Sequence, residues 1–203
     1  MANRNRPELG CYHRELPAEI RAAEGEDGVI ELSFSSEAPY ERIFGLEILD
    51  HSKKSVRLQR LKDVGCVLFN HDRDRVIAGI KKVWLGDDGK CHAKIRFDED
   101  EPSQIIKKKV ESGTLKGVSV GYQIYDWEEV GKNAKSTDGK YKGPCWVARD
   151  WEPYEFSIVS VPADTTVGVG RSLENGNRQG RSLDWFVRQS DINKATFKQE
   201  ERP

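Results

Sequence analysis

The stretch VIELSFS, residues 29–35, sets the first expectation for the fold. In it Ile30, Leu32 and Phe34 alternate with glutamate and serine, so that every second side chain is apolar. A period of two is typical of a β-strand with one face buried against a core. We therefore expect β-structure from residue 29 onward.

Eight further segments have the same character, because they combine alternation with β-branched and aromatic residues. They are residues 44–49, 55–61, 64–69, 76–85, 91–97, 118–127, 145–151 and 154–161. The sequence GDDG at residues 86–89 predicts a hairpin turn between two of them. Many short strands favour a small closed barrel or a sandwich, so the expected fold class is mainly β (α+β).

Two segments are predicted as helices. Residues 101–112, EPSQIIKKKVES, have a proline near the start, place Ile105, Ile106 and Val110 on one stripe, and end just before a glycine. Residues 17–24, PAEIRAAE, are a shorter helical candidate in the charged N-terminal region. The domain is therefore expected to consist of strands flanked by at least one helix.

Composition divides the 203-residue chain into three parts. Residues 1–28 are charged and interrupted by proline and glycine, which predicts an N-terminal arm. Residues 29–165 carry the strand pattern and form the expected domain, and residues 166–203 are expected to be a polar C-terminal tail. Because only 36% of the residues are hydrophobic and 33% are charged, part of the chain is expected to lie outside a packed core.

Charge and cysteine content argue against several classes of protein. The 33 Lys and Arg nearly balance the 34 Asp and Glu, which argues against a dedicated nucleic-acid-binding protein. No apolar run approaches the roughly 18 residues of a membrane span, and the polar N-terminus is unlike a secretory signal. The four cysteines form no C-x-x-C pair, which favours free thiols in a reducing compartment over a disulfide framework or a zinc site. We therefore expect an intracellular protein with no nucleic-acid or membrane partner.

Ser119 lies at the centre of the sequence GVSVG, residues 117–121, which matches the pattern G-x-S-x-G. In α/β-hydrolases this pattern places a serine on a strand-to-helix turn, with the catalytic histidine later in the chain. Here a strand pattern follows the serine, and all four histidines precede it, so an α/β-hydrolase is excluded. Ser119 remains a candidate nucleophile if a neighbouring base can remove its proton.

His71 is the strongest candidate for that base. It lies in the sequence FNHD, residues 69–72, where an apolar strand ends in a charged turn that leaves side chains accessible. The alternative interpretation is a turn held by Asx hydrogen bonds. Of the other histidines, His13 belongs to the expected arm, His51 ends an unremarkable strand, and His92 lies within a strand, where packing or exposure accounts for it.

Glu155 is a candidate for the acid that would hold the imidazole, because it lies in a strand of otherwise apolar or small residues. By alternation it shares a face with Ser157. A carboxylate in such a strand needs a partner. The alternative is a structural ion pair with Arg149 or Lys142.

Three sequence blocks in this order resemble the prohead proteases of tailed bacteriophages, which are serine proteases of capsid maturation. The blocks are VLFNHD (67–72), GTLKGVSVGY (113–122) and EFSIVSVPA (155–163), and the upstream EIL (47–49) is also similar. The resemblance implies a β-barrel protease like herpesvirus assemblin, with one or more flanking helices. It further implies His71 as general base, Ser119 as nucleophile and Glu155 as the acid, with no cofactor and no metal.

The same resemblance implies the biological setting. The substrate would be scaffold protein or the scaffolding segment of the major capsid protein, cleaved inside the immature capsid in the host bacterial cytoplasm. The protein would also cleave itself, and the tail is a candidate for removal. Two alternatives stay open: a non-catalytic β-barrel that assembles capsids or binds scaffold, and a Ser–Lys dyad in which Lys116 replaces His71.

Overall fold

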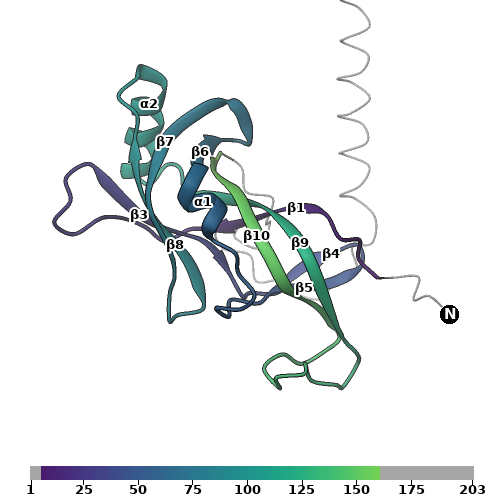
Figure 1. Ribbon diagram of the computed structural model, residues 1–203. Helices are drawn as coiled ribbons and strands as arrows, with labels where there is room; N and C mark the ends of the chain where they lie inside the picture. The colour runs from purple at the N-terminus through teal and green to yellow at the C-terminus, as the bar shows by residue number, and fades with distance from the viewer. Residues whose placement is uncertain (1–5, 161–203) are drawn as a thin grey trace, which may run out of the picture. The chain divides into compact units, whose positions relative to one another are not determined.

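Ten strands pair into one sheet, as the alternating segments predict (Figure 1). The computed structural model describes residues 6–160, which all belong to one compact unit. The strands are β1 (Cys11–Pro17), β2 (Ile20–Ala22), β3 (Val29–Ser36), β4 (Tyr40–Arg42), β5 (Gly45–Leu49), β6 (Cys66–Phe69), β7 (Asp72–Leu85), β8 (Lys90–Phe97), β9 (Gly117–Val130) and β10 (Cys145–Val159). The helices are α1 (Gln59–Val64) and α2 (Glu101–Glu111). The expected mainly β fold with flanking helices is confirmed.

The sheet curls so that its two ends come together. Its strands follow the order β1-β9-β10-β6-β7-β8-β3-β2, and β5, which also carries β4, pairs with β10. Only Ala18 and Glu19 separate β1 at one end from β2 at the other. Ala18 N–H donates to the Lys116 carbonyl (3.0 Å), and the Glu19 carbonyl accepts from Ser33 N–H (3.3 Å). This short linker therefore holds the β9 side and the β3 side of the sheet next to each other.

The long strands β9 and β10 form the antiparallel pair that runs through the middle of Figure 1. Ser119 is opposite Ser157, and Gly121 is opposite Glu155. The sequence suggests two strands, at residues 145–151 and 154–161, but the structure has the single strand β10, which ends at Val159. The register shifts between Pro153 and Glu155, and such a bulge tolerates a proline and can re-aim the side chain beside it. On its other side β10 pairs in parallel with β5 and then with β6.

The core lies inside the curl and contains large side chains from most of the strands. Phe34 stacks on Phe156 with ring centroids 4.9 Å apart, and Trp151 and Tyr122 are also fully buried. The predicted helix 101–112 corresponds to α2, whose Ile106 and Val110 pack into this core. Fully burying a side chain of this size contributes about 1.5–3 kcal/mol, so these contacts stabilise the framework of the site.

The predicted short helix at residues 17–24 is wrong. Part of this segment forms β2, which pairs with β3 so that Ile20 is opposite Leu32 and Ala22 is opposite Ile30. The alanines favour a helix locally, but pairing with an open strand edge outweighs a propensity of a few tenths of a kcal/mol per residue. With β1, which pairs with β9, the expected arm thus contributes two strands to the sheet.

The predicted strand at residues 55–61 is also wrong. Within it Val56 makes only an isolated bridge to Trp151, and α1 begins at Gln59. Leu58 and Leu61 are three residues apart, which is a helical spacing, and both contact the core. The helix covers β10 and β7.

Two of the segments singled out in the sequence fall beyond residue 160. Residues 161–163 of the third sequence block and the tail at 166–203 lie outside the described residues, so their boundaries stay predictions. Within residues 6–160 no helix combines the length and apolar character needed to cross a bilayer.

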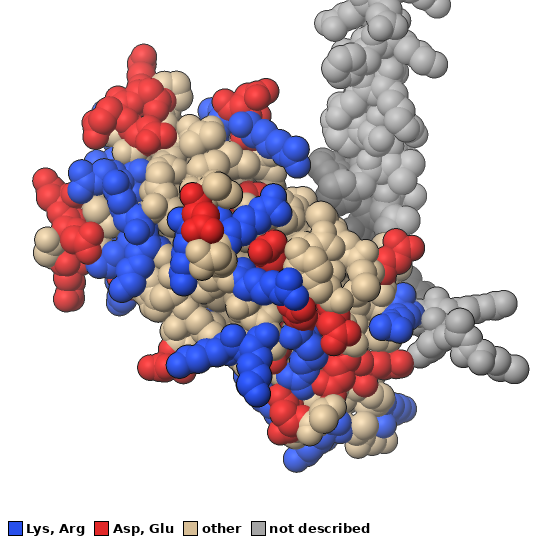
Figure 2. All heavy atoms as spheres, viewed as in Figure 1, with Lys and Arg blue, Asp and Glu red and all other residues tan. Residues whose placement is uncertain are grey.

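Charges of both signs are interspersed over the face shown in Figure 2, in keeping with the balanced composition. Many of them meet in exposed ion pairs, such as Arg57 with Asp150 and Lys90 with Glu19. Water and salt screen the attraction in pairs of this kind, and holding two long side chains together costs entropy. They therefore add little to the stability that the core provides.

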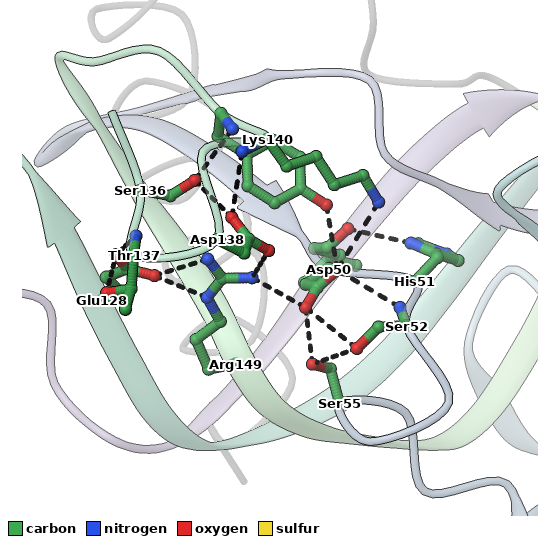
Figure 3. Close-up of polar contacts among 12 residues, drawn as sticks. Asp50, His51, Ser52, Ser55, Glu128, Ser136, Thr137, Asp138, Lys140 and Arg149 are labelled. Atoms are coloured by element: carbon green, nitrogen blue, oxygen red, sulfur yellow. Dashed lines mark hydrogen bonds and ion pairs between the residues drawn. The ribbon is translucent and has the colours of Figure 1, made fainter. Parts of the chain in front are cut away.

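A polar cluster around the buried Asp50 anchors the β9–β10 loop to the end of β5 (Figure 3). We call it the Asp50 cluster; its members are Asp50, Ser52, Ser55, Glu128, Asp138, Tyr141 and Arg149. The Asp50 carboxylate accepts hydrogen bonds from Ser55 Oγ (2.6 Å), Arg149 Nη1 (2.9 Å) and Tyr141 Oη (3.0 Å). Burial alone would raise the pKa of Asp50, but these hydrogen bonds lower it below its usual value. The cluster thus holds an ionised carboxylate inside the fold.

Candidate active site

The three side chains singled out in the sequence contact one another. His71 Nε2 lies 2.6 Å from Ser119 Oγ in β9, and His71 Nδ1 lies 2.7 Å from Glu155 Oε1 in β10. The three residues are far apart in the sequence. They come together because β9 pairs with β10 and β6 also pairs with β10.

The turn between β6 and β7 positions the imidazole. Asn70 and His71 are its two central residues, and both have positive φ, 54° and 59°, as in a type I′ hairpin turn. Asn70 N–H donates to the Ile158 carbonyl (3.0 Å), and Asn70 Oδ1 accepts from Ser160 N–H (2.9 Å). A non-glycine residue in this conformation is uncommon and needs such support. FNHD is thus a tight turn whose Asn70 side chain is held by the distant Ser160 rather than by a local Asx hydrogen bond, and this turn directs His71 toward Ser119.

Ser157 ties the acid to the turn. Its hydroxyl donates to Glu155 Oε2 (3.0 Å) and accepts from His71 N–H (3.1 Å). In one tautomer His71 donates from Nδ1 to Glu155 and accepts from Ser119 at Nε2. This is the arrangement in which an imidazole can take a serine proton while a carboxylate stabilises the resulting cation. Ser119 is fully buried, whereas 27% of the His71 side chain is exposed.

His13 lies beside this group, although its place in the sequence predicts that it belongs to the N-terminal arm. In the register of β1, β9 and β10, His13 is opposite Gly121, which is in turn opposite Glu155. Because Gly121 has no side chain, His13 and Glu155 meet above it, with Nε2 3.6 Å from Oε1. The His13 ring also lies edge-on to His71, with centroids 4.6 Å apart. Partial burial and the nearby His71 lower the pKa of His13, although Glu155 acts in the opposite direction.

Gly121 is needed for this close approach. A Cβ at this position would lie 2.4 Å from Glu155 Oε1 and 2.8 Å from the ring of Tyr154. Both distances are shorter than van der Waals contact allows. The second glycine of the GVSVG sequence therefore makes room for the carboxylate, which is a different task from forming a strand-to-helix turn.

The other residues that the sequence offers as partners for Ser119 or Glu155 lie away from them. Lys116 turns toward Gly113, where its Nζ is 3.9 Å from the place of an added Cβ. Arg149, the suggested ion-pair partner of Glu155, belongs to the Asp50 cluster. His51 is buried against Ser35 and the Leu49 carbonyl, and its burial lowers its pKa to about 4. His92 pairs with Asp88 at 3.0 Å.

Comparisons with known proteins agree with the sequence blocks. The major capsid protein of Halomonas phage phiHAP-1 is 34% identical over 146 residues, which are 70% of this chain but only 23% of that protein. The bacteriophage T4 capsid assembly protease gp21 aligns over 77% of this chain and 100% of its own, with a TM-score of 0.45 and 13% identity. Residues 47–195, well over half of the chain, match the family model described as caudovirus prohead serine protease. The chain therefore belongs to the caudovirus prohead serine protease family.

Proposed function

We propose that this chain is a serine endopeptidase that cleaves capsid proteins while the phage head matures. The observation that carries the proposal is the contact series from Glu155 to His71 to Ser119, with distances of 2.7 and 2.6 Å. Ser119 attacks the peptide carbonyl, His71 takes its proton and returns it to the leaving amine, and Glu155 holds the imidazole.

The proposed substrate is scaffold protein or the scaffolding segment of the major capsid protein, together with the chain itself. A segment of a protein named major capsid protein is similar to this chain. This similarity supports the choice, because it places a sequence like this chain in the same polypeptide as a capsid protein. Cleavage would take place inside the immature capsid in the host bacterial cytoplasm.

Incubation of the purified chain with its cognate capsid and scaffold proteins tests the proposal. We expect discrete new fragments by gel and mass spectrometry with the wild-type chain and none with Ser119→Ala. Mixing an excess of Ser119→Ala with wild type should show whether the chain is also its own substrate. If wild type and Ser119→Ala give the same pattern, the chain is a non-catalytic assembly protein.

Gly121→Ala is expected to lower the rate of this cleavage by about 100-fold, the effect of displacing a reacting group by about 1 Å. The added methyl group would clash with Glu155 Oε1 and the Tyr154 ring, so Glu155 must shift from the position in which it contacts His71. The measurement is kcat on a peptide that spans a mapped cleavage site. Gly79→Ala in β7 is the matched control, because a Cβ there meets nothing within 4 Å, and it should keep the wild-type rate. A Gly121→Ala protein as active as this control would show that Glu155 is not needed in its observed position.

A further inference from the structure

Three side chains that can bind a metal meet beside Ser119. They are His13 from β1, His71 from the β6–β7 turn and Glu155 from β10, and one ligand atom from each lies within 4.8 Å of the others. Two imidazoles and a carboxylate are a ligand set that zinc uses in proteins, with a fourth position left for water.

The spacing of these atoms suits a tetrahedral ion. Ligands that lie about 2.0–2.1 Å from zinc are about 3.3 Å apart from one another. His13 Nε2 is 3.6 Å and His71 Nδ1 is 2.7 Å from Glu155 Oε1, so these two separations bracket this value, and the ligand atoms of the two histidines lie within 4.8 Å of each other. Small side-chain movements are therefore enough to place all three around one ion.

The surroundings support the ligands and leave the site accessible. Ser157 Oγ donates to Glu155 Oε2 and so fixes the carboxylate, as outer partners of metal ligands commonly do. The His13 side chain is 52% exposed, which gives an ion a path from solvent. His13 Nε2 also lies 3.1 Å from Tyr154 Oη, and an ion would replace this contact.

We propose that His13, His71 and Glu155 form a zinc site whose occupation reversibly inhibits the enzyme. The inhibition, though not the binding, rests on the function proposed above. The role of zinc here is to block the reaction, so the expectation of a metal-free catalytic mechanism is unchanged.

The inhibition follows from the two nitrogens of one imidazole. The Nδ1 atom that faces Glu155 would bind zinc through its lone pair, so the neutral ring would carry its proton on Nε2. Nε2 would then donate a hydrogen bond to Ser119 Oγ and could no longer accept the serine proton. Zinc binding and general-base catalysis therefore exclude each other at His71.

Titration of metal-free Ser119→Ala protein with zinc chloride in a calorimeter tests the site without relying on activity. We expect one zinc ion per chain, and a loss of affinity of at least about tenfold when His13→Gln is added. His92→Gln and Cys11→Ser are matched controls, because His92 pairs with an acid elsewhere and Cys11 is an exposed thiol in the same strand as His13. Neither control should change the affinity.

Proton NMR of the four histidines gives a second measurement that needs no variant at His13. Zinc should shift the imidazole signals of His13 and His71 and leave those of His51 and His92 in place. The site is overturned if zinc does not bind, if its binding survives His13→Gln, or if either control abolishes it. If zinc binding depends on His13 but the zinc-loaded wild type cleaves at the same rate as the metal-free protein, the proposed inhibition is wrong and the proposed zinc site is supported.

Discussion

Alanine at Ser119, at His71 or at both positions is expected to lower kcat for peptide cleavage to the same residual rate, roughly 10³–10⁶-fold below wild type. The hydroxyl cannot attack without a base, and the base has no proton to take without the hydroxyl. Because His71 Nε2 and Ser119 Oγ are 2.6 Å apart, we expect the two residues to act as one unit. Removing either residue should therefore remove the whole contribution of the pair to the rate. The double variant should therefore be no slower than the single variants.

The measurement is single-turnover cleavage of a peptide that spans a mapped site, with each variant checked for folding by thermal unfolding. Ser103→Ala and His92→Ala are matched controls, since Ser103 is a buried serine of α2 and His92 lies in β8. Both should retain the wild-type rate. Multiplicative losses in the double variant would show that the two residues contribute independently, which contradicts the proposed mechanism.

Arg149→Met is expected to lower the free energy of unfolding by about 3 kcal/mol, the lower end of the cost of removing one partner from a buried ion pair. Arg149 donates to Asp50, Glu128 and Asp138, with distances of 2.9, 2.6 and 2.9 Å. The Asp50 side chain is only 3% exposed, so its charge would be left in the interior. Lys140 Nζ, 3.7 Å from Asp50 Oδ1, can offset part of the loss.

Urea denaturation at pH 7 measures this loss. Arg57→Met is the control, because the Arg57–Asp150 pair is largely exposed and screened by solvent, so its removal should cost much less than that of Arg149. The loss should also depend on pH. The folded state lowers the pKa of Asp50 below its usual value of 3.8, so its contribution to stability is present above that pH and is lost as the pH falls through the folded pKa. The difference between wild type and Arg149→Met should therefore shrink below about pH 4. A difference that is small at pH 7 would show that the Asp50 cluster does not stabilise the fold.

Local patterns in the sequence predict the parts of the fold that depend on local rules. Alternation identifies most strands because each packs one face on a single core, and helix α2 follows from its apolar stripe and its proline. Ser119 and His71 can be found because each lies in a short, distinctive sequence, GVSVG or FNHD. Glu155 is visible because a charge in an apolar strand needs a partner.

What the sequence does not reveal depends on pairing between distant segments. His13 joins the site only because β1 lies against β9, so its neighbours are 58 and 142 residues further along the chain. The sequence allows Arg149 as an ion-pair partner of Glu155, but the register of β10 places Arg149 beside Asp50. β2 is a strand because an open edge is available, and its own residues favour a helix. Gly121 leaves room for His13 and Glu155 to meet. This role cannot be inferred from the sequence until it is known that β1 and β10 are the strands on either side of Gly121.

The place of β9 within the sheet constrains how a peptide can reach Ser119. In the described residues β9 has β1 along one side and β10 along the other, and Ser119 is opposite Glu15 and Ser157. Peptide recognition by β-augmentation needs a strand with free main-chain donors and acceptors, and β9 offers none at this position. If the proposed function holds, a peptidomimetic inhibitor should therefore be shaped to cross the side-chain face of the sheet above His71, since one designed as an added strand would have to compete with the chain's own β1.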